Sequence, residues 1–454
     1  MSSNRIKQQS HPASGLDGAS AMHGDPAASD TTYLSGPGNA AIRSDFIYLN
    51  GVCSTVLVRK DGNIIAVCSD FSDQSPMVYL IDHHSNDVLA SIRLELGSTL
   101  GGIYGFLDAK DQLVMADGAR SITWLAVSNK QGVWNFKQKK KRNLSSVILK
   151  GEFINAINID ELGAIWFVTD KATVGRYDPK ENEMESIKLA ENETVHNSFA
   201  NSGDGKAAIA TNKALYILHY DDEVDVFLHA PYDSGSYRKP GKLSNGTGSS
   251  PTFFGPVSGT EFVTIADNAD DGERVLIYDA HVENPDRALL CSVDVPAYGG
   301  VFASENSPIA IGRTVIISST YGYPYPIDNV LPPSVPSFAP IEGGMHRIDL
   351  RNSYKPGKGA KKGNRENCHI QWSNAARSAA VPKLSVSDKL VYTVERLDDE
   401  YSFSAIEYST GETLHSQTLG AGNLFNTLQL AGNVGFQRVF WQGTTGGIVK
   451  VSAD

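Results

Sequence analysis

The amino-acid sequence predicts an all-β fold, a β-propeller of eight blades, from three observations. Residues 153–190 hold four short runs joined by tight polar connections, and Ile157 and Ile159 alternate there with polar residues, as in a half-buried strand. Four antiparallel strands of this length form one blade, and similar units repeat to the end of the chain. The third run of several units ends in an aspartate whose carboxylate suits the following turn, namely Asp82, Asp178, Asp221, Asp279 and Asp349.

Each unit is expected to supply four strands. The first four units are expected at 54–59, 64–68, 77–82 and 88–94; from 103 through 113–116 and 122–127 to 147–149; at 154–160, 164–170, 173–178 and 184–190; and at 198, 207–210, 215–220 and 224–228. The next four are expected at 252–254, 261–266, 274–279 and 289–293; 309–311, 314–318, 345–350 and 369–372; 383–386, 390–394, 402–408 and 413–418; and 427–431, 439–442 and 448–451.

The last unit lacks an outer strand, and residues 45–49 form an unassigned run of the right length. We therefore predict that 45–49 pairs beside 448–451 and closes the ring, which removes an exposed sheet edge. A ring of seven blades is the alternative. The basic run 137–142 is expected on the solvated outer edge of a blade, where lysines block pairing with other sheets.

Residues 1–43 are expected to form a flexible tail in front of a single propeller domain at 44–454. They are rich in Ser, Ala, Gly, Asp and Pro, which leaves little apolar surface to bury. Met22, Tyr33 and Leu34 are the side chains that could still contact the propeller. Removal of this tail is expected to leave the fold intact.

The overall composition limits the kinds of binding partner and the cell compartments that we expect. A net charge of −11 argues against a nucleic-acid partner, which needs basic surface, and the chain holds no run of 18 apolar residues to span a membrane. The N-terminus shows no signal peptide, which slightly favours the cytoplasm over secretion. The four cysteines lie far apart and are expected as buried thiols, without a disulfide framework or zinc site; they are Cys53, Cys68, Cys291 and Cys368. The oligomeric state stays open.

The candidate site lies on the face that carries the loops from second to third strands and from one blade to the next. Polar residues near the starts of first strands are expected at its mouth; hydrogen bonding inside the channel is the alternative for each. They are Asn155, His196, Asn197, Ser250, Thr252, Glu305, Arg377 and Asn426. His196 is the best acid–base candidate, because an unperturbed histidine titrates near neutrality.

Two loops on this face are unusual. The loop 319–344 carries three tyrosines and six prolines, so we expect a semi-rigid lid with Tyr321 or Tyr323 at the ligand; decoration of the blade is the alternative. The loop 267–272, which includes Asn268, is aspartate-rich. It departs from the calcium-loop template, with Ala269 at the third position and Tyr278 in place of the final glutamate, so we expect a hairpin without metal.

The sequence resembles a group of fungal and bacterial propeller proteins through the stretches 22–25, 29–32, 36–38, 245–253 and 264–270. This group is similar to the hetero-Diels–Alderases of fungal tropolone–sesquiterpene pathways. The resemblance implies a cofactor-free pericyclase that dehydrates a hydroxymethyl tropolone or phenol to an o-quinone methide and guides its addition to a humulene-type terpene. Eight blades also resemble the quinoprotein dehydrogenases, more distantly, but their adjacent cysteine pair and tryptophan-docking repeats do not occur here.

Three functional classes remain open. For the pericyclase, we assign His196, Arg377 and Tyr323 to catalysis; substrate contacts are assigned to Asn155, Asn197, Ser250, Thr252, Asn268, Tyr321 and Asn426. The second class is a hydrolase, lactonase or lyase with a metal in the channel, held by Glu305, Asn155 and Asn197. The third is a binding or scaffold propeller without catalysis. The first class requires a small-molecule substrate, no cofactor and no metal.

Overall fold

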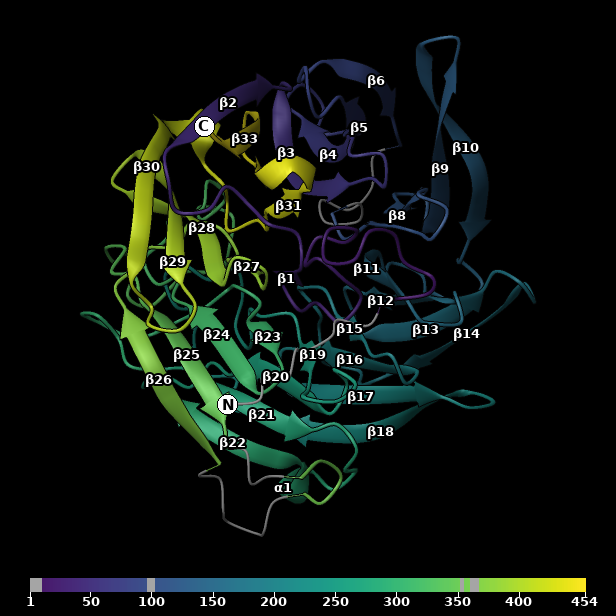
Figure 1. Ribbon diagram of the computed structural model, residues 1–454. Helices are drawn as coiled ribbons and strands as arrows, with labels where there is room; N and C mark the ends of the chain where they lie inside the picture. The colour runs from purple at the N-terminus through teal and green to yellow at the C-terminus, as the bar shows by residue number, and fades with distance from the viewer. Residues whose placement is uncertain (1–9, 96–102, 352–354, 360–366) are drawn as a thin grey trace.

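The computed structural model describes residues 10–95, 103–351, 355–359 and 367–454, and residues 1–9 of the expected tail lie outside them. Eight sheets surround a central axis, so the predicted eight-bladed propeller is confirmed (Figure 1). Seven sheets have four strands, and one has a fifth, short strand from the N-terminus. In several pairs of neighbouring blades the innermost strands contact each other.

From the inside outward, the first four blades are β3 Gly51–Val58, β4 Ile64–Asp70, β5 Pro76–Ile81, β6 Val88–Arg93; β7 Phe106–Leu107, β8 Leu113–Asp117, β9 Ser121–Lys130, β10 Val133–Asn143; β11 Ile154–Ile159, β12 Ile165–Thr169, β13 Thr173–Asp178, β14 Glu183–Lys188; and β15 Ala200–Asn201, β16 Lys206–Ala210, β17 Ala214–Tyr220, β18 Val224–Pro231. The next three are β19 Thr252–Phe254, β20 Phe262–Ala266, β21 Arg274–Asp279, β22 Leu289–Asp294; β23 Ile309–Ile311, β24 Thr314–Ser318, β25 Met345–Leu350, β26 Cys368–Asn374; and β27 Lys383–Ser385, β28 Leu390–Leu397, β29 Glu400–Glu407, β30 Thr413–Ala421, with β1 Thr31–Thr32 added inside β27. The eighth is β31 Asn433–Gly435, β32 Val439–Gly443, β33 Gly447–Ala453 and β2 Ile42–Tyr48, and the short helices are α1 Pro285–Ala288, η1 Asn423–Phe425 and η2 Phe436–Arg438.

The ring closes as predicted. Strand β2 lies antiparallel to β33, with Ile47 opposite Ile448 and Ser44 opposite Val451. The last blade is therefore built from both ends of the described chain, which leaves no unpaired strand at the junction (Figure 1).

Two strand assignments from the sequence are wrong. The outer strand of the second blade is β10, which contains the basic run 137–142, and residues 147–149 form no strand. The solvated position predicted for that run is confirmed, because β10 is the edge of its sheet and is largely exposed. In the eighth blade the inner strand is β31 rather than 427–431, where Leu428 and Gln429 take positive φ angles of 52° and 58° that a strand does not allow.

The aspartates at the ends of third strands act mostly as predicted. The Asp82 carboxylate accepts backbone N–H groups of His84 and Ser85 at 2.8 and 2.9 Å. The Asp178 carboxylate accepts from the N–H of Lys180 at 2.7 Å. Each carboxylate therefore fixes the turn into the fourth strand.

The segment 10–41, hereafter the N-terminal segment, is part of the fold instead of a flexible tail. Met22 is 7% exposed, as contact with the propeller requires, Leu34 is partly buried, and Tyr33 remains 36% exposed. Its backbone carbonyls accept hydrogen bonds from all eight blades; the donors are Val58, Leu107, Asn158, Asn201, Phe253, Ala310, Leu384 and Asn433. The composition of this segment predicted a tail because small residues bury little apolar surface. The same small residues fit against the closely spaced inner strands of the ring, so the segment is ordered by contacts that its composition does not reveal.

A buried ion pair ties this segment to the seventh blade. The carboxylate of Asp30 accepts from Lys383 Nζ at 3.0 Å and contacts His23 Nδ1 at 2.9 Å. Both Asp30 and Lys383 are completely buried, and the adjacent β1 runs parallel to β27. Neither charge is close to water, so each stabilises the other only while the segment stays in place.

The expectation of four buried thiols is also wrong. Cys53 and Cys68 lie opposite each other in β3 and β4 and form a disulfide, and Cys291 on β22 is joined to Cys368 on β26 of the next blade. The described residues include no free cysteine. No helix within the described ranges is long and apolar enough to cross a membrane.

Candidate functional site

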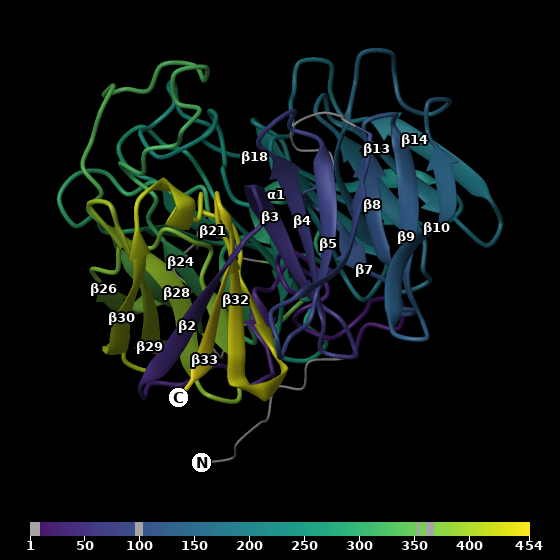
Figure 2. The same cartoon turned by 90° about the horizontal axis from the view of Figure 1, so that it is seen from above.

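The long loop 319–344 between β24 and β25, hereafter the lid loop, covers the face where a ligand site was expected. Figure 2 shows it in green at the upper end of the blades, while much of the purple N-terminal segment lies at the lower end. Beneath the loop is a pocket of about 570 Å³, hereafter the lid pocket. Its lining includes Tyr323, Phe338 and Ile341 of the loop, three loop prolines, and the side chains Arg238, Arg377, Arg396, Asp328 and Asp398.

Buried tyrosines hold the lid loop down. Tyr323 is 1% exposed and its hydroxyl donates to Oδ1 of Asn426, while the N–H of Leu428 donates to the same hydroxyl at 3.1 Å. The Tyr325 ring packs edge-on against Tyr323 with centroids 5.1 Å apart. Burial raises the pKa of Tyr323 well above its ordinary value, so its hydroxyl stays protonated near neutral pH and cannot act as a base.

Three arginines and two aspartates are the charged residues in the lining of the lid pocket. Arg238 is buried and donates to Asp328 at 2.9 Å and to the carbonyl of Lys242 at 2.7 Å. The guanidinium of Arg396 lies 5.6 Å from the ring centroid of Tyr323, a cation–π contact at the pocket wall. Arg377 is exposed at the rim, where its Nε donates to the carbonyl of Ile341 at 3.2 Å.

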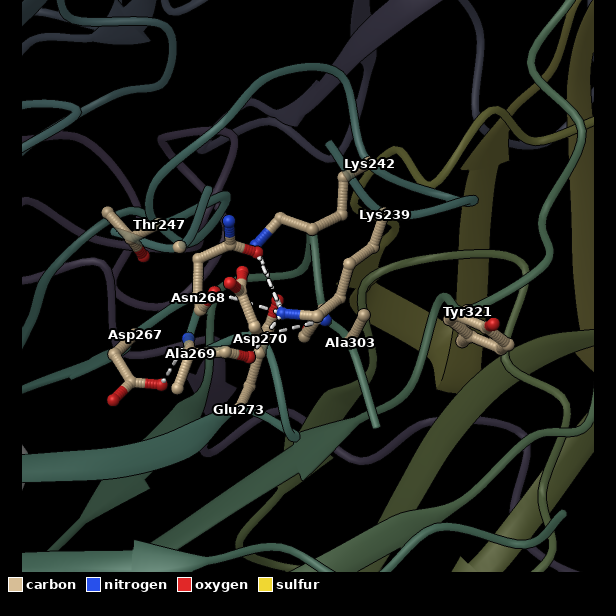
Figure 3. A network of polar contacts seen from close by, with 12 residues as sticks. Lys239, Lys242, Thr247, Asp267, Asn268, Ala269, Asp270, Glu273, Ala303 and Tyr321 are labelled. Carbon is tan, nitrogen blue, oxygen red and sulfur yellow. Dashed lines mark hydrogen bonds and ion pairs between the residues drawn. The ribbon is translucent and has the colours of Figure 1, made fainter. Parts of the chain in front are cut away.

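A buried polar network around Lys239 and Lys242 fixes the segment that follows Arg238 in the sequence; Figure 3 shows the two lysines with Asn268 and Glu273. Lys242 Nζ pairs with Glu273 at 2.6 Å, and both side chains are completely buried. Lys239 Nζ donates to Oδ1 of Asn268 at 3.1 Å and to the carbonyl of Ala269 at 2.6 Å. Burial raises the pKa of Glu273 and lowers the pKa of Lys239. Asn268 therefore serves this network, which anchors the loop carrying Arg238 to the fifth blade.

Most polar residues expected at the mouth join neighbouring blades instead. Asn155 donates to the carbonyl of Asn197 at 2.9 Å, and the hydroxyls of Ser198 and Ser250 are 2.6 Å apart. Thr252 donates to the carbonyl of Ala28 in the N-terminal segment at 3.1 Å, so it lies away from the lid loop that we expected above it. These residues therefore form hydrogen bonds inside the ring, which was the alternative to a position at the mouth.

His196 and Tyr321 lie outside the lid pocket lining. His196 is exposed on the connection between β14 and β15, and its Nε2 lies 3.0 Å from the Thr194 hydroxyl. Tyr321 is buried against Ala303 and Ala339 at the base of the lid loop. The structure therefore brings together Arg377, Tyr323 and, through Tyr323, Asn426, but not His196.

Glu305 is buried, not a free group at the mouth. Its Oε2 accepts from the N–H of Leu243 at 3.2 Å, its Oε1 lies 3.5 Å from Asn197 Nδ2, and burial raises its pKa. No group of three or more His, Cys, Asp or Glu side chains within the described part of the chain is arranged to hold a metal ion. The 267–272 loop joins β20 to β21 as the predicted hairpin, with Asp270 accepting from the N–H and hydroxyl of Ser236 at 2.8 and 2.7 Å.

Sequence reasoning missed Arg238 and Arg396. Arg396 stands at the end of β28, where the hairpin to β29 emerges on the same face as the lid loop, and Arg238 lies in the connection from β18 to β19. Loops from second to third strands and from one blade to the next lie on the same face as the lid loop, and both arginines lie at or in such a connection. The two arginines were missed because the candidate polar residues were taken only from the starts of first strands.

Comparisons with known proteins agree on the fold. No protein-family model matches the chain. An uncharacterized protein of Archaeoglobus fulgidus is 23% identical over 319 residues, which cover 67% of this chain and 62% of that protein, so the match spans under two thirds of the relative's length. The quinohemoprotein alcohol dehydrogenase of Comamonas testosteroni aligns with a TM-score of 0.55 and 11% identity over 97% of this chain and 80% of that one. A virginiamycin B lyase of Staphylococcus aureus aligns with a TM-score of 0.45 and 9% identity over 91% of this chain and 100% of that one. Identities this low show the β-propeller fold alone.

Proposed function

We propose that the protein is a pericyclase of the hetero-Diels–Alderase type, which dehydrates a hydroxymethyl tropolone or phenol in the lid pocket and guides its cycloaddition to a humulene-type terpene. One observation carries the proposal: a pocket of about 570 Å³ combines arginine side chains with a wall of tyrosine, phenylalanine and proline. This volume suits a small organic ligand. The lining suits a molecule with an acidic oxygen and a large apolar body.

In the first step the substrate loses water. The ring hydroxyl gives up its proton, the C–O bond of the hydroxymethyl group breaks with its electron pair, and the leaving hydroxide takes up a proton to become water. The carbon left behind is the exocyclic CH₂ of an o-quinone methide. A guanidinium beside the ring oxygen favours the deprotonated form, because arginine stays protonated and attracts the negative charge.

In the second step the quinone methide and an alkene of the terpene form one C–C and one C–O bond to give a dihydropyran. No atom leaves, so the protein has to hold both partners in a reactive pose, which supplies at most about 7–11 kcal/mol. The lid loop would exclude the water that otherwise hydrates the quinone methide. Its prolines restrict the backbone and so lower the entropy cost of keeping it in place.

Within this scheme Arg396 and Arg377 bind the ring oxygen. Arg396 is held against aromatic rings, at 5.6 Å from Tyr323 and 5.4 Å from Tyr401, so its position is set before the substrate enters. Tyr323 forms the wall and supports the loop, since its hydroxyl already bonds Asn426. His196 has no part in the scheme, because it does not line the pocket.

The test is turnover of a hydroxymethyl tropolone in the presence of humulene, followed by mass spectrometry of the dihydropyran. We expect Arg396→Gln to reduce product formation by at least about tenfold, as loss of an oxyanion donor does. Arg351→Gln, an exposed arginine after β25, is the matched control and should react like the unmodified protein. The proposal fails if Arg396→Gln and Arg377→Gln both react at the full rate.

Two other outcomes would select the competing functions. Turnover that EDTA abolishes and calcium restores would indicate a metal-dependent lyase or hydrolase. Saturable binding of the tropolone without any turnover would indicate a binding propeller.

A further inference from the structure

A second pocket, of about 490 Å³, lies at the opposite end of the blades from the lid loop. It is formed by the N-terminal segment and by the inner ends of four blades, at Glu161 after β11, Asn201 in β15, the 255–260 turn after β19 and Gly312 after β23. These positions lie at the turns from first to second strands, whereas the lid loop follows a second strand. We call this cavity the turn-face pocket, and no residue of it takes part in the proposed reaction.

The charge of the turn-face pocket is negative. Its lining contains Asp17, Asp25 and Glu161, and none of its lining residues in the described ranges is a lysine or arginine. The remaining wall is partly apolar, with Phe254, Val257 and prolines. The lid pocket differs, because it contains three arginines beside two aspartates, and one of these aspartates, Asp328, pairs with Arg238 at 2.9 Å.

Several buried polar atoms of this pocket lack hydrogen-bond partners in the described part of the chain. Oε1 of Glu161, Oδ1 of Asn201 and both ring nitrogens of His11 are buried and have no hydrogen-bond partner among the described residues. Asn201 is 1% exposed, so its amide oxygen cannot be satisfied by bulk water. Unsatisfied buried acceptors are uncommon in folded proteins and call for a donor from a ligand or bound water.

The three residues that carry these atoms line the same pocket, and two short approaches connect the segments to which they belong. A Cβ on Gly203, two residues after Asn201, would lie 3.1 Å from Oε1 of Glu161, and a Cβ on Gly163 would lie 3.9 Å from Cβ of Ala13, two residues after His11. Burial lowers the pKa of His11 to about 4, so the ring is neutral at pH 7 and one of its nitrogens is an acceptor. A carboxylate, an amide oxygen and an imidazole nitrogen match the three donors of a primary ammonium group.

We propose that the turn-face pocket binds a primary amine with a small apolar body, its ammonium group held by Glu161, Asn201 and His11. The carboxylate supplies the charge, and the apolar wall of Phe254 and Val257 takes the body of the ligand. The amine is a second ligand, separate from the substrate of the lid pocket.

The experiment is isothermal titration of the full-length protein with phenethylamine, and with 2-phenylethanol as the neutral probe of the same shape. We expect saturable binding of the amine that is at least about tenfold tighter than binding of the alcohol. Glu161→Gln should weaken amine binding by about tenfold or more, because a charged acceptor is replaced by a neutral one. Glu223→Gln, an exposed glutamate in the hairpin after β17, is the matched control and should bind like the unmodified protein.

A second variant tests the location without changing charge. Gly203→Ala places a methyl group against Oε1 of Glu161 and should weaken the amine but leave tropolone binding at the lid pocket unchanged. Thermal melting of each variant checks that it is folded. Equal binding of amine and alcohol, no saturable amine binding, or full affinity in Glu161→Gln would each overturn the proposal.

Discussion

Replacing Asp30 with asparagine should destabilise the whole propeller, although Asp30 lies in a segment whose composition resembles a tail. Asp30 and Lys383 are both 0% exposed and their charged atoms are 3.0 Å apart. Removing the carboxylate leaves the Lys383 ammonium buried without its ion-pair partner at 3.0 Å. Breaking a buried pair in this way typically costs about 3–5 kcal/mol.

The double variant Asp30→Asn with Lys383→Met separates the charge effect from other damage. It removes both charges, so we expect it to recover most of the stability lost in Asp30→Asn. Asp45→Asn provides the control, because Asp45 pairs with Arg43 at the surface, with exposed fractions of 30% and 67%. Such an exposed pair contributes about 1 kcal/mol at most.

Urea-induced unfolding, followed by tryptophan fluorescence, measures these differences as shifts of the midpoint. The predicted order of midpoints is unmodified protein and Asp45→Asn highest, the double variant next, and Asp30→Asn lowest. If Asp30→Asn unfolds at the same urea concentration as Asp45→Asn, the N-terminal segment is not an integral part of the ring. The sequence-based expectation that its removal leaves the fold intact would then stand.

Three further predictions concern other parts of the ring. Replacing Cys291 and Cys368 together by serine should lower the free energy of unfolding by about 4 kcal/mol, measured against the oxidised protein, because that disulfide spans 77 residues of sequence. Burial lowers the pKa of His346 to about 4, below its unfolded value near 6.5. The free energy of unfolding should therefore decline as the pH falls from 6.5 to 4, because the unfolded chain binds the proton more readily. His346→Gln should flatten that decline, measured as melting temperature against pH. Tyr323→Phe should cost about 1 kcal/mol in thermal unfolding, because the hydroxyl that donates to Oδ1 of Asn426 is lost, while the N–H of Leu428 keeps Oδ1 of Asn426 as an acceptor at 3.0 Å; an unchanged melting temperature would contradict the hydrogen bonding found there.

The blades could be predicted because their information is local. A hairpin such as that joining β3 to β4 is specified by an Asp-Gly turn between alternating apolar residues, and neither depends on distant parts of the chain. Ring closure by β2 followed from counting strands. The disulfide between Cys291 and Cys368 could not be predicted, because it depends on which outer strands of neighbouring blades face each other.

The candidate site was predicted in part. The length of the lid loop and its place between second and third strands located it on the correct face, and Arg377 and Tyr323 do line the pocket beneath it. His196 shares that face but not the pocket, since strand order fixes the face and not the position around the ring. Residues at the inner strand starts, such as Ser250, form hydrogen bonds to a neighbouring blade, which a sequence pattern cannot distinguish from contact with a ligand.

The most direct test of the central claim is a crystal structure of the protein soaked with tropolone. The account predicts the ligand in the lid pocket, with its oxygens within hydrogen-bond distance of Arg396 or Arg377 and its ring against Tyr323 or Phe338. Tropolone bound at another place on the ring, or an empty lid pocket in a crystal soaked at saturating concentration, would contradict it.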